Sequence, residues 1–248
     1  MCGRFVAATP PSALAERFQA ELAPELAGDG ELGPRFNVAP TLPVYAVAAS
    51  RRTGARRLGA FRWGLVPSWA ADPSVGSRMI NARVETVATR PAFRPALLRR
   101  RCIIPADAFY EWQRRGGRTE GHTKQTKGHT RQPFAIRRRD GGLLPFAGLW
   151  EMWRAEDAPH GSPLLRTCTI ITTPANDAVA SLHDRMPAIL APGAWDEWLD
   201  PAACDLSRLL RLLQPASPAD FAVYPVSTEV NNARNEGAQL VLPIEPGG

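Results

Sequence analysis

Apolar residues gather in short runs, or alternate with polar ones, along most of the chain. Such runs are typical of buried or half-buried strands. They predict strands at Val44–Ala48, Leu58–Val66, Arg101–Ile104, Ala108–Trp112, Phe134–Arg138, Phe146–Trp153, Thr167–Thr172 and Ala222–Val226. A spacing of three or four residues between apolar positions predicts helices at Pro10–Leu22, Pro174–Leu182, Ala194–Leu199 and Leu206–Leu213.

The order of these elements favours one fold class. Helices do not regularly separate the strands, which disfavours a doubly wound parallel sheet. We therefore predict an α+β fold with a largely antiparallel, curved or barrel-like sheet and peripheral helices. The 248 residues suit one large domain or two small ones. Without an internal repeat or a long linker, we expect a single domain over residues 1–248, with a flexible basic insert loop at 114–132.

The basic residues of the chain are almost all arginine. The formal net charge is +6, and of 30 basic residues only Lys124 and Lys127 are lysine. A GC-rich genome produces such a bias without functional meaning, whereas a polyanionic partner also favours arginine, because its planar guanidinium fits phosphate. Both lysines lie in the polar insert, so a buried Schiff-base lysine is not expected.

Cysteine spacing and apolar run lengths argue against several protein classes. The four cysteines (Cys2, Cys102, Cys168 and Cys204) are far apart and form no C-x-x-C pair, which disfavours a zinc site and a disulfide scaffold. We expect neither a metal nor another cofactor. No stretch approaches the roughly 18 apolar residues of a membrane span, and the N-terminus lacks a signal-peptide pattern. These features predict a cytoplasmic protein without a membrane partner.

Unusual chemistry becomes available at the second residue. If Met1 is removed, Cys2 carries a free α-amine beside its thiol. An α-amine has a pKa of about 8, so much of it is an uncharged nucleophile at neutral pH. An amine and a thiol on one residue condense with an aldehyde to close a thiazolidine ring. The alternative is an inert, half-buried residue at a chain end.

Further polar residues lie in apolar surroundings. Asn37 and Asn81 could cap turns, and Arg83 and Glu85 could form a surface pair. Glu111 is harder to explain structurally, because it lies in the aromatic sequence Phe-Tyr-Glu-Trp. A carboxylate in such a strand is costly unless paired, and its pKa is often raised.

Six motifs together carry a family resemblance. Met-Cys-Gly-Arg-Phe, Arg-Phe-Asn-Val-Ala-Pro, Arg-Trp-Gly-Leu-Val-Pro-Ser-Trp, Asn-Ala-Arg-Val-Glu-Thr, Phe-Tyr-Glu-Trp and His-Asp-Arg-Met-Pro follow one another along the chain. In this order they resemble the SOS-response-associated peptidase family, whose members process abasic sites and crosslink to DNA. The similarity covers Cys2 to Pro187 and weakens through Val226-Ser227 and Val230–Asn232. The insert 114–132 is longer and more basic than the family pattern.

The resemblance implies a function in the DNA damage response. The chain would crosslink covalently to abasic sites in single-stranded DNA, a lyase-type activity that protects the lesion, and would remove its own Met1 by an autopeptidase activity. The implied partners are single-stranded DNA with abasic sites and replication-fork proteins. We expect a monomer that associates with the nucleoid when it is bound to DNA.

The resemblance also implies catalytic roles, residue by residue. Cys2 would form a Schiff base through its amine and then a thiazolidine through its thiol. Glu111 would shuttle protons during imine formation and assist Met1 removal. His183 would handle the proton on the sugar hydroxyl or ring oxygen, and Asn81 would hold the sugar by hydrogen bonding. Asp184 is not expected to complete a triad.

Arginines and aromatic residues near these positions are candidate DNA contacts. Arginines would hold the flanking phosphates, while tryptophan and proline faces would stack or wedge the strand, with at least one tryptophan in the core. An abasic site has no base to read, so little sequence preference is expected. The predicted DNA-binding residues are Arg4, Asn37, Pro40, Trp63, Trp69, Arg83, Thr173, Arg185 and Met186.

Two other functions remain open at this point. An N-terminal-nucleophile cysteine peptidase or amidohydrolase would use Cys2 against an amide, with His183 or Glu111 assisting. It would turn over peptides and tolerate serine in part at position 2. A non-catalytic single-stranded DNA-binding module would keep its DNA affinity, and form no covalent product, when Cys2 is replaced.

Overall fold

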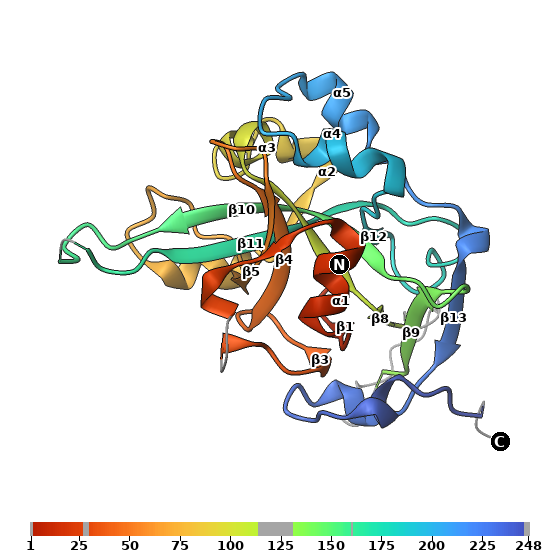
Figure 1. Ribbon diagram of the computed structural model, residues 1–248. Helices are drawn as coiled ribbons and strands as arrows, with labels where there is room; N and C mark the ends of the chain where they lie inside the picture. The colour runs from red at the N-terminus through yellow and green to blue at the C-terminus, as the bar shows by residue number, and fades with distance from the viewer. Residues whose placement is uncertain (1, 27–29, 114–130, 160, 246–248) are drawn as a thin grey trace, which may run out of the picture.

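The computed structural model describes residues 2–26, 30–113, 131–159 and 161–245 (Figure 1). The strands are β1 (Phe5–Ala7), β2 (Glu21–Leu22), β3 (Arg35–Val38), β4 (Pro43–Ala49), β5 (Arg56–Trp63), β6 (Asn81–Arg83), β7 (Arg101–Ala106), β8 (Ala108–Trp112), β9 (Pro133–Arg138), β10 (Leu144–Trp153), β11 (Leu165–Pro174), β12 (Arg185–Pro187) and β13 (Phe221–Pro225). The helices are α1 (Pro11–Phe18), α2 (Val84–Val87), α3 (Arg94–Arg99), α4 (Trp195–Leu199) and α5 (Leu206–Arg211).

Five strands close into a barrel at the centre of the molecule. Strands β5, β4, β7, β10 and β11 pair antiparallel in that order. The ring closes where β11 pairs parallel with β5, with Thr167 opposite Arg62 and Cys168 opposite Trp63. Beyond that point β6 and β12 continue along the two edges of β11. The predicted α+β fold with a largely antiparallel, barrel-like core is confirmed.

A second, antiparallel sheet has the order β13–β9–β8–β1–β3. Phe109 on β8 and Phe5 on β1 join the apolar cluster that also holds Phe146 and Trp63 of the barrel strands. The rings of Phe5 and Trp63 meet edge to face, with their centroids 5.1 Å apart. This contact places the start of the chain between the sheet and the barrel.

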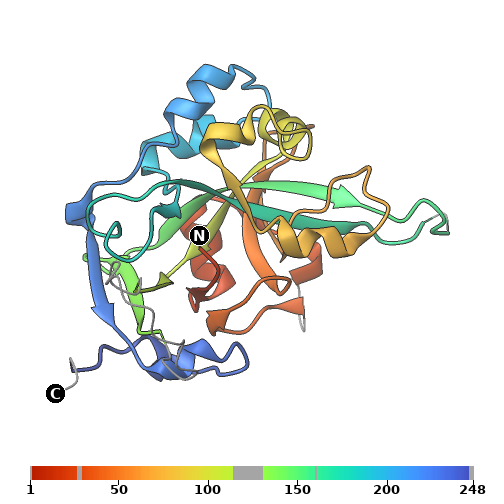
Figure 2. The ribbon, with the colours of Figure 1, turned by 180° about the vertical axis from the view of Figure 1, so that it is seen from behind.

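Helices α2 to α5 gather at one end of the barrel, at the top of Figure 1, and a long β10–β11 hairpin projects to its side (Figures 1 and 2). A second apolar cluster joins them to the barrel, through Val87, Leu97, Trp198 and Leu209. Arg101 on β7 lies beneath this layer and is 4% exposed. Its guanidinium donates to the carbonyls of Leu97, Trp198 and Asp200, at the C-terminal ends of α3 and α4.

The predicted strands are all present, with ends displaced by at most three residues. Two helix predictions need correction. Residues 174–182 form no helix, because β11 extends to Pro174, which pairs with Arg185, and hydrogen-bonded turns follow. The first helix ends at Phe18 instead of Leu22, since Gln19 adopts a left-handed conformation with φ of 51°. The short helices α2 and α3 were not predicted.

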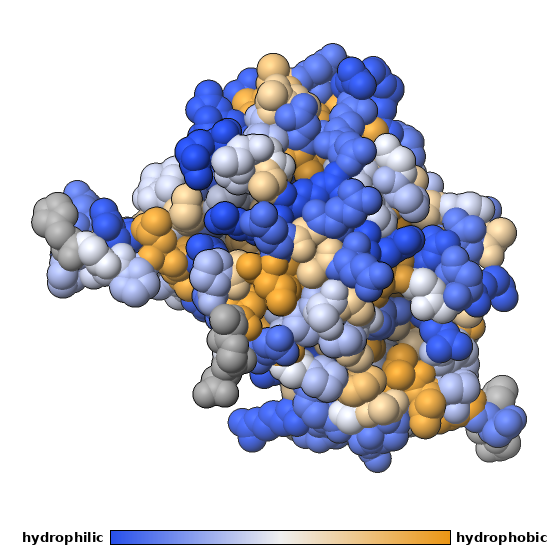
Figure 3. All heavy atoms as spheres, in the orientation of Figure 1, coloured by the Kyte–Doolittle hydropathy of each residue, from blue (hydrophilic) through white to orange (hydrophobic). Residues whose placement is uncertain are grey.

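Hydrophilic side chains predominate on the face shown in Figure 3, with apolar ones in separate groups between them. Within the described part of the chain, no helix is long and apolar enough to cross a membrane. Most of the predicted insert loop, residues 114–130, lies outside the described residues.

Candidate active site

Cys2 lies just before β1, beside the strand that carries Glu111. Strand β1 pairs antiparallel with β8, with Phe5 opposite Phe109 and Val6 opposite Ala108. The Tyr110 amide continues this ladder by donating to the Arg4 carbonyl at 3.0 Å. Extending the register by one more residue places the Cys2–Gly3 segment alongside Glu111.

Asn81 reaches the same segment from the barrel side. It begins β6, which pairs parallel with β11 so that Asn81 lies opposite Ile170. Its Nδ2 donates to the Cys2 carbonyl oxygen at 2.8 Å. Its Oδ1 is buried and has no hydrogen-bond partner among the described residues. Asn81 therefore holds the Cys2 backbone with one end of its amide and keeps an acceptor at the other.

The Cys2 thiol is fully buried, with 0% of the residue exposed. Burial, and secondly the negative charge of Glu111, raise the pKa of this thiol well above its ordinary value. A group with such a pKa is protonated at neutral pH, so the thiol needs a base before it can act as a nucleophile. Glu111 is near enough to exert this effect.

Glu111 is buried on the face of β8 that also carries Phe109, and it is 3% exposed. Burial raises the pKa of this carboxyl from 4.5 to about 7, because the charged form loses its hydration there. A group with a pKa near 7 exists in both protonation states at neutral pH. It can therefore take up and return a proton within one reaction.

His183 lies in the turn before β12, and its side chain is 27% exposed. Its Nδ1 accepts a hydrogen bond from the Arg185 amide at 2.9 Å. Asp184 Oδ1 also lies 2.9 Å from Nδ1, but it can bind there only if Nδ1 carries a proton. A neutral ring that accepts the amide hydrogen bond carries its proton on Nε2, whereas a protonated ring can bind Asp184 from Nδ1.

The predicted catalytic residues thus come from four separate segments. Hydrogen bonding links Asn81 to Cys2, and electrostatic effects link Cys2 to Glu111. Asp184, the neighbour of His183, is near enough to Glu111 to raise the pKa of that carboxyl further. Among the described residues, no group of three or more His, Cys, Asp or Glu side chains could hold a metal ion.

Four predicted DNA contacts are buried. Asn37, Trp63, Thr173 and Met186 are each 0% exposed, so their side chains do not offer a surface to a DNA strand. Trp63 instead packs on Phe5 and donates from Nε1 to the carbonyl of Ile80, next to Asn81. Their role as DNA contacts stays a prediction, and in the structure they lie beneath the site.

Arg4 and Asn37 tie the N-terminal strand to the C-terminal segment. Arg4 Nη1 donates to Asn37 Oδ1 at 2.8 Å and to the Val230 carbonyl at 2.9 Å. Asn37 Nδ2 in turn contacts the carbonyl oxygens of Val230, Asn232 and Asn235. These bonds hold the chain immediately after Cys2, and burial lowers the pKa of Arg4.

The other predicted DNA contacts reach the surface to different extents. Trp69 is 67% exposed and Arg83 is exposed, whereas Pro40 is half-buried. The side chain of Arg185 is 11% exposed and binds Glu85 through two hydrogen bonds. The sequence had suggested Arg83 as the partner of Glu85. Only the position of β12 beside β11 brings Arg185 there instead.

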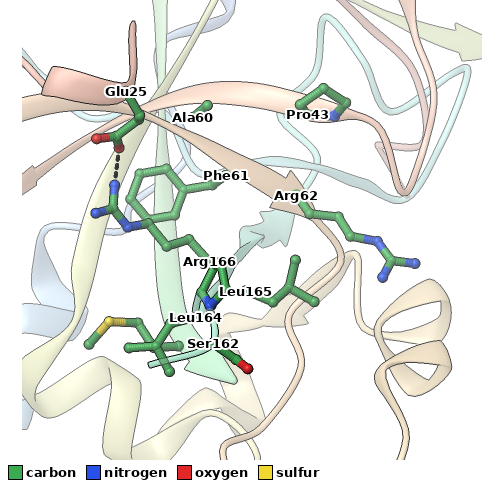
Figure 4. Close-up of a pocket in the computed structure, with 11 residues that line it drawn as sticks. Glu25, Pro43, Ala60, Phe61, Arg62, Ser162, Leu164, Leu165 and Arg166 are labelled. Carbon is green, nitrogen blue, oxygen red and sulfur yellow. Dashed lines mark hydrogen bonds and ion pairs between the residues drawn. The ribbon is translucent and has the colours of Figure 1, made fainter. Parts of the chain in front are cut away.

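A cavity of about 690 Å³ opens elsewhere, beside β5 and the start of β11 (Figure 4). Its walls are largely apolar and include Phe61 and Leu165, with the ion pair of Glu25 and Arg166 at one side. None of the four predicted catalytic residues lines it. The cavity is therefore distinct from the site around Cys2.

Comparison with known proteins relates almost the whole chain to one group. The family model described as "SOS response associated peptidase (SRAP)" matches residues 1–233. The chain is 40% identical over 241 residues to "Abasic site processing protein YoqW" of Bacillus subtilis (strain 168), covering 97% of this chain and 99% of that protein. It is 32% identical over 250 residues to "Abasic site processing protein YedK" of Escherichia coli (strain K12), covering 98% and 100%.

Similarity extends to a vertebrate protein and to solved structures. "Abasic site processing protein HMCES" of Gallus gallus is 35% identical over 241 residues, covering 90% of this chain and 70% of that protein. A crystal structure from Bacteroides thetaiotaomicron shares the fold with a TM-score of 0.81 at 21% identity, covering 98% and 100% of the two chains. A phage-related protein from Bordetella bronchiseptica gives a TM-score of 0.61 at 27% identity, covering 91% and 94%.

Proposed function

Because the chain belongs to the SOS response associated peptidase family, whose relatives include abasic site processing proteins, we propose that it crosslinks covalently to abasic sites in single-stranded DNA through Cys2. The observation that carries this proposal is the position of Cys2. Its carbonyl is held by Asn81, and its thiol lies within the electrostatic reach of Glu111. The substrate is the ring-opened aldehyde of the abasic sugar.

The proposed reaction begins with the removal of Met1, which frees the α-amine of Cys2. The amine adds to the aldehyde carbon, and loss of one water molecule gives an imine. The thiol then adds across the carbon–nitrogen double bond. The sulfur forms a bond to carbon, its proton passes to a base, and the nitrogen gains a proton, which closes the thiazolidine ring.

Glu111 is the proposed proton carrier in these steps. With a pKa of about 7, its carboxyl can protonate the departing hydroxyl and afterwards accept the proton of the thiol. A base is required there, because burial holds the thiol in its protonated form. The same carboxylate is suited to assist the hydrolysis that removes Met1.

His183 and Asn81 are the proposed sugar ligands. His183, whose Nδ1 accepts a hydrogen bond from the Arg185 amide, is the proposed donor to the sugar ring oxygen or hydroxyl. Asn81 Oδ1 is the buried acceptor for a sugar hydroxyl. The exposed Arg83, two residues beyond Asn81, is the proposed phosphate ligand, and Trp69 the proposed stacking face.

The test uses a single-stranded oligonucleotide that carries one aldehyde-bearing abasic site. Wild-type protein should give a heat-stable adduct on denaturing gels, with the combined mass of protein and DNA less one water. Cys2→Ala should abolish it, whereas Asn81→Ala, Glu111→Gln and His183→Ala should slow it. Cys204→Ala is the matched control, because Cys204 is the exposed cysteine and should be dispensable.

Further assays separate this function from the two alternatives. A cysteine peptidase would cleave peptides and retain part of its activity in Cys2→Ser, whereas a thiazolidine cannot form with serine. A simple binding module would bind the oligonucleotide with equal affinity in wild type and Cys2→Ala, and neither protein would form an adduct. Intact mass of the purified protein reports directly whether Met1 has been removed.

A further inference from the structure

Strand β5 is incompletely covered along the edge where the barrel closes. On this edge β2 lies opposite Arg57 and Leu58, and β11 lies opposite Arg62 and Trp63. The two registers leave residues 59–61 of β5 without a strand opposite them. The barrel wall therefore has a gap between β5 and the start of β11, and the cavity of about 690 Å³, the outer cavity, lies at this gap (Figure 4).

A second space adjoins the gap on the inside of the barrel. Successive side chains of a strand point to opposite faces, so Phe61 lies on the face of β5 that carries Trp63 into the barrel core. The rings of Phe61 and Trp150 meet edge to face, with their centroids 5.8 Å apart. Beside them is an inner cavity of about 240 Å³, which is also lined by Ala48 and Gly59. Small residues at this mouth of the barrel leave the space free of side chains.

The outer and inner cavities share part of their lining. Phe61 and Met152 line both, as does the ion pair of Glu25 with Arg166. The side chains of Arg166 and Glu25 are 43% and 38% exposed, so water screens their attraction and the pair contributes little to stability. A ligand in the outer cavity can therefore separate this pair at small cost and extend into the inner one.

The wall of the outer cavity exposes apolar side chains to water. Leu164 is 48% exposed and Met152 is 38% exposed. Pro43, Phe61 and Leu165 continue the apolar surface between them. An apolar body bound here would remove this surface from water, which is favourable. Cavities of this size with a largely apolar lining are typical of small-molecule sites, and barrel mouths are a common location.

Three arginines surround the two cavities, and two of them are already paired. Arg57 pairs with Glu21, and Arg166 pairs with Glu25. Among the described residues, no acidic side chain forms an ion pair with Arg62, which lines the outer cavity on the side away from Glu25 (Figure 4). The planar guanidinium binds two acceptor oxygens of one acid group well. The cavity thus combines an apolar wall with an available cation.

We propose that the outer and inner cavities form a binding site for a small amphipathic carboxylate. Its acid group binds the guanidinium of Arg62, and its apolar body packs on Phe61, Met152 and Leu165. The inference goes beyond the proposed function, because none of the four predicted catalytic residues lines either cavity. Single-stranded DNA is also anionic, but it binds along rows of cations, and Arg57 and Arg166 are engaged by acidic partners.

The probe for this site is 8-anilinonaphthalene-1-sulfonate, an aromatic anion whose fluorescence rises in apolar surroundings. Wild type should bind it saturably, with one site per chain, and octanoate should displace it. Octanamide, which has the same chain without the charge, should compete about 10-fold or more weakly. Single-stranded DNA with a tetrahydrofuran in place of the abasic sugar, which has no aldehyde, should not displace the probe. Displacement by this DNA would assign the cavities to the DNA-binding surface and overturn the carboxylate site.

Variants of the cavity wall locate the binding. Arg62→Gln should weaken octanoate binding by about 10-fold or more, whereas Arg211→Gln, which removes the same charge from the exposed surface of α5, should leave it unchanged. Equal affinities in these two variants would overturn the proposal, as would the lack of saturable probe binding by wild type.

Ala60 provides a second test that leaves Arg62 in place. Its half-buried side chain lines the outer cavity, beside the gap in the barrel wall. Ala60→Glu should abolish probe binding, because a carboxylate there repels the anion, whereas Ala60→Lys, of similar length, should retain it. Equal losses in the two variants, with melting temperatures close to that of wild type, would contradict an anion at this position.

Discussion

The buried carboxyl of Glu111 should make the stability of the protein depend on pH in a specific way. Burial raises its pKa from 4.5 to about 7 in the folded chain, while the unfolded chain retains the ordinary value. Between these two values the folded protein holds a proton that the unfolded protein has released. The free energy of unfolding therefore falls as the pH rises from 4.5, and the loss is complete above pH 7.

Glu111→Gln removes this titration while keeping the shape of the side chain. One pKa unit corresponds to about 1.4 kcal/mol, so the rise of the Glu111 pKa to about 7 costs the wild type about 3 kcal/mol above neutral pH. Relative to wild type, the variant should gain about 3 kcal/mol at pH 8 but only about 1 kcal/mol at pH 5. In melting temperature the gain at pH 8 is roughly 6–12 °C for a chain of this size.

Urea unfolding at pH 5 and pH 8, without DNA, measures both values by linear extrapolation. The decisive quantity is the difference of about 2 kcal/mol between the stability gain of the variant at pH 8 and its gain at pH 5. Any hydrogen bond that glutamine loses lowers both gains equally and does not affect this difference. Glu151→Gln is the control: Glu151 is 6% exposed but pairs with Arg100, so losing its charge should destabilise the protein at pH 8. A Glu111→Gln effect that is the same at both pH values would refute the raised pKa.

Two further predictions concern stability and DNA binding. Arg101→Met should lower the free energy of unfolding by about 3–5 kcal/mol, because three carbonyls at the ends of α3 and α4 lose their donor. Urea unfolding measures this loss, and a value below about 1 kcal/mol would contradict the prediction. Trp69→Ala should weaken binding of tetrahydrofuran-containing single-stranded DNA by about 1–3 kcal/mol, since Trp69 is 67% exposed, while Met152→Ala, which removes another exposed apolar side chain, should leave the affinity unchanged. Equal affinities for wild type and Trp69→Ala would exclude a stacking role.

The sequence was most informative where local pattern and final burial agree. The run Ala108–Trp112 is apolar on both sides of Glu111, and the strand has the predicted ends because both of its faces are covered. The spacing of apolar residues predicted a helix at Pro174–Leu182, and this prediction was wrong. There β11 extends to Pro174 because Arg185, eleven residues further along the chain, pairs with it, and a partner at that distance leaves no periodic signal.

The candidate chemistry was readable from the sequence because it belongs to single residues. Only a cysteine at position 2 can offer an amine and a thiol to one carbon once Met1 is removed, and a carboxylate among aromatic residues already indicated a raised pKa. Those properties depend on covalent structure and immediate neighbours. The tertiary structure decided which polar groups meet: Asn81 with the Cys2 carbonyl, and Glu85 with Arg185 instead of the nearby Arg83.

Burial was likewise decided by the fold alone. Trp63 and Trp69 stand in one motif, yet one is enclosed against Phe5 and the other is 67% exposed. Exposure depends on which distant strands pack over a residue, and the closure of the barrel between β5 and β11 covers Trp63. The chemical identity of a residue determines what its side chain can do. Contacts between segments far apart in the chain determine whether that side chain meets solvent, substrate or another residue.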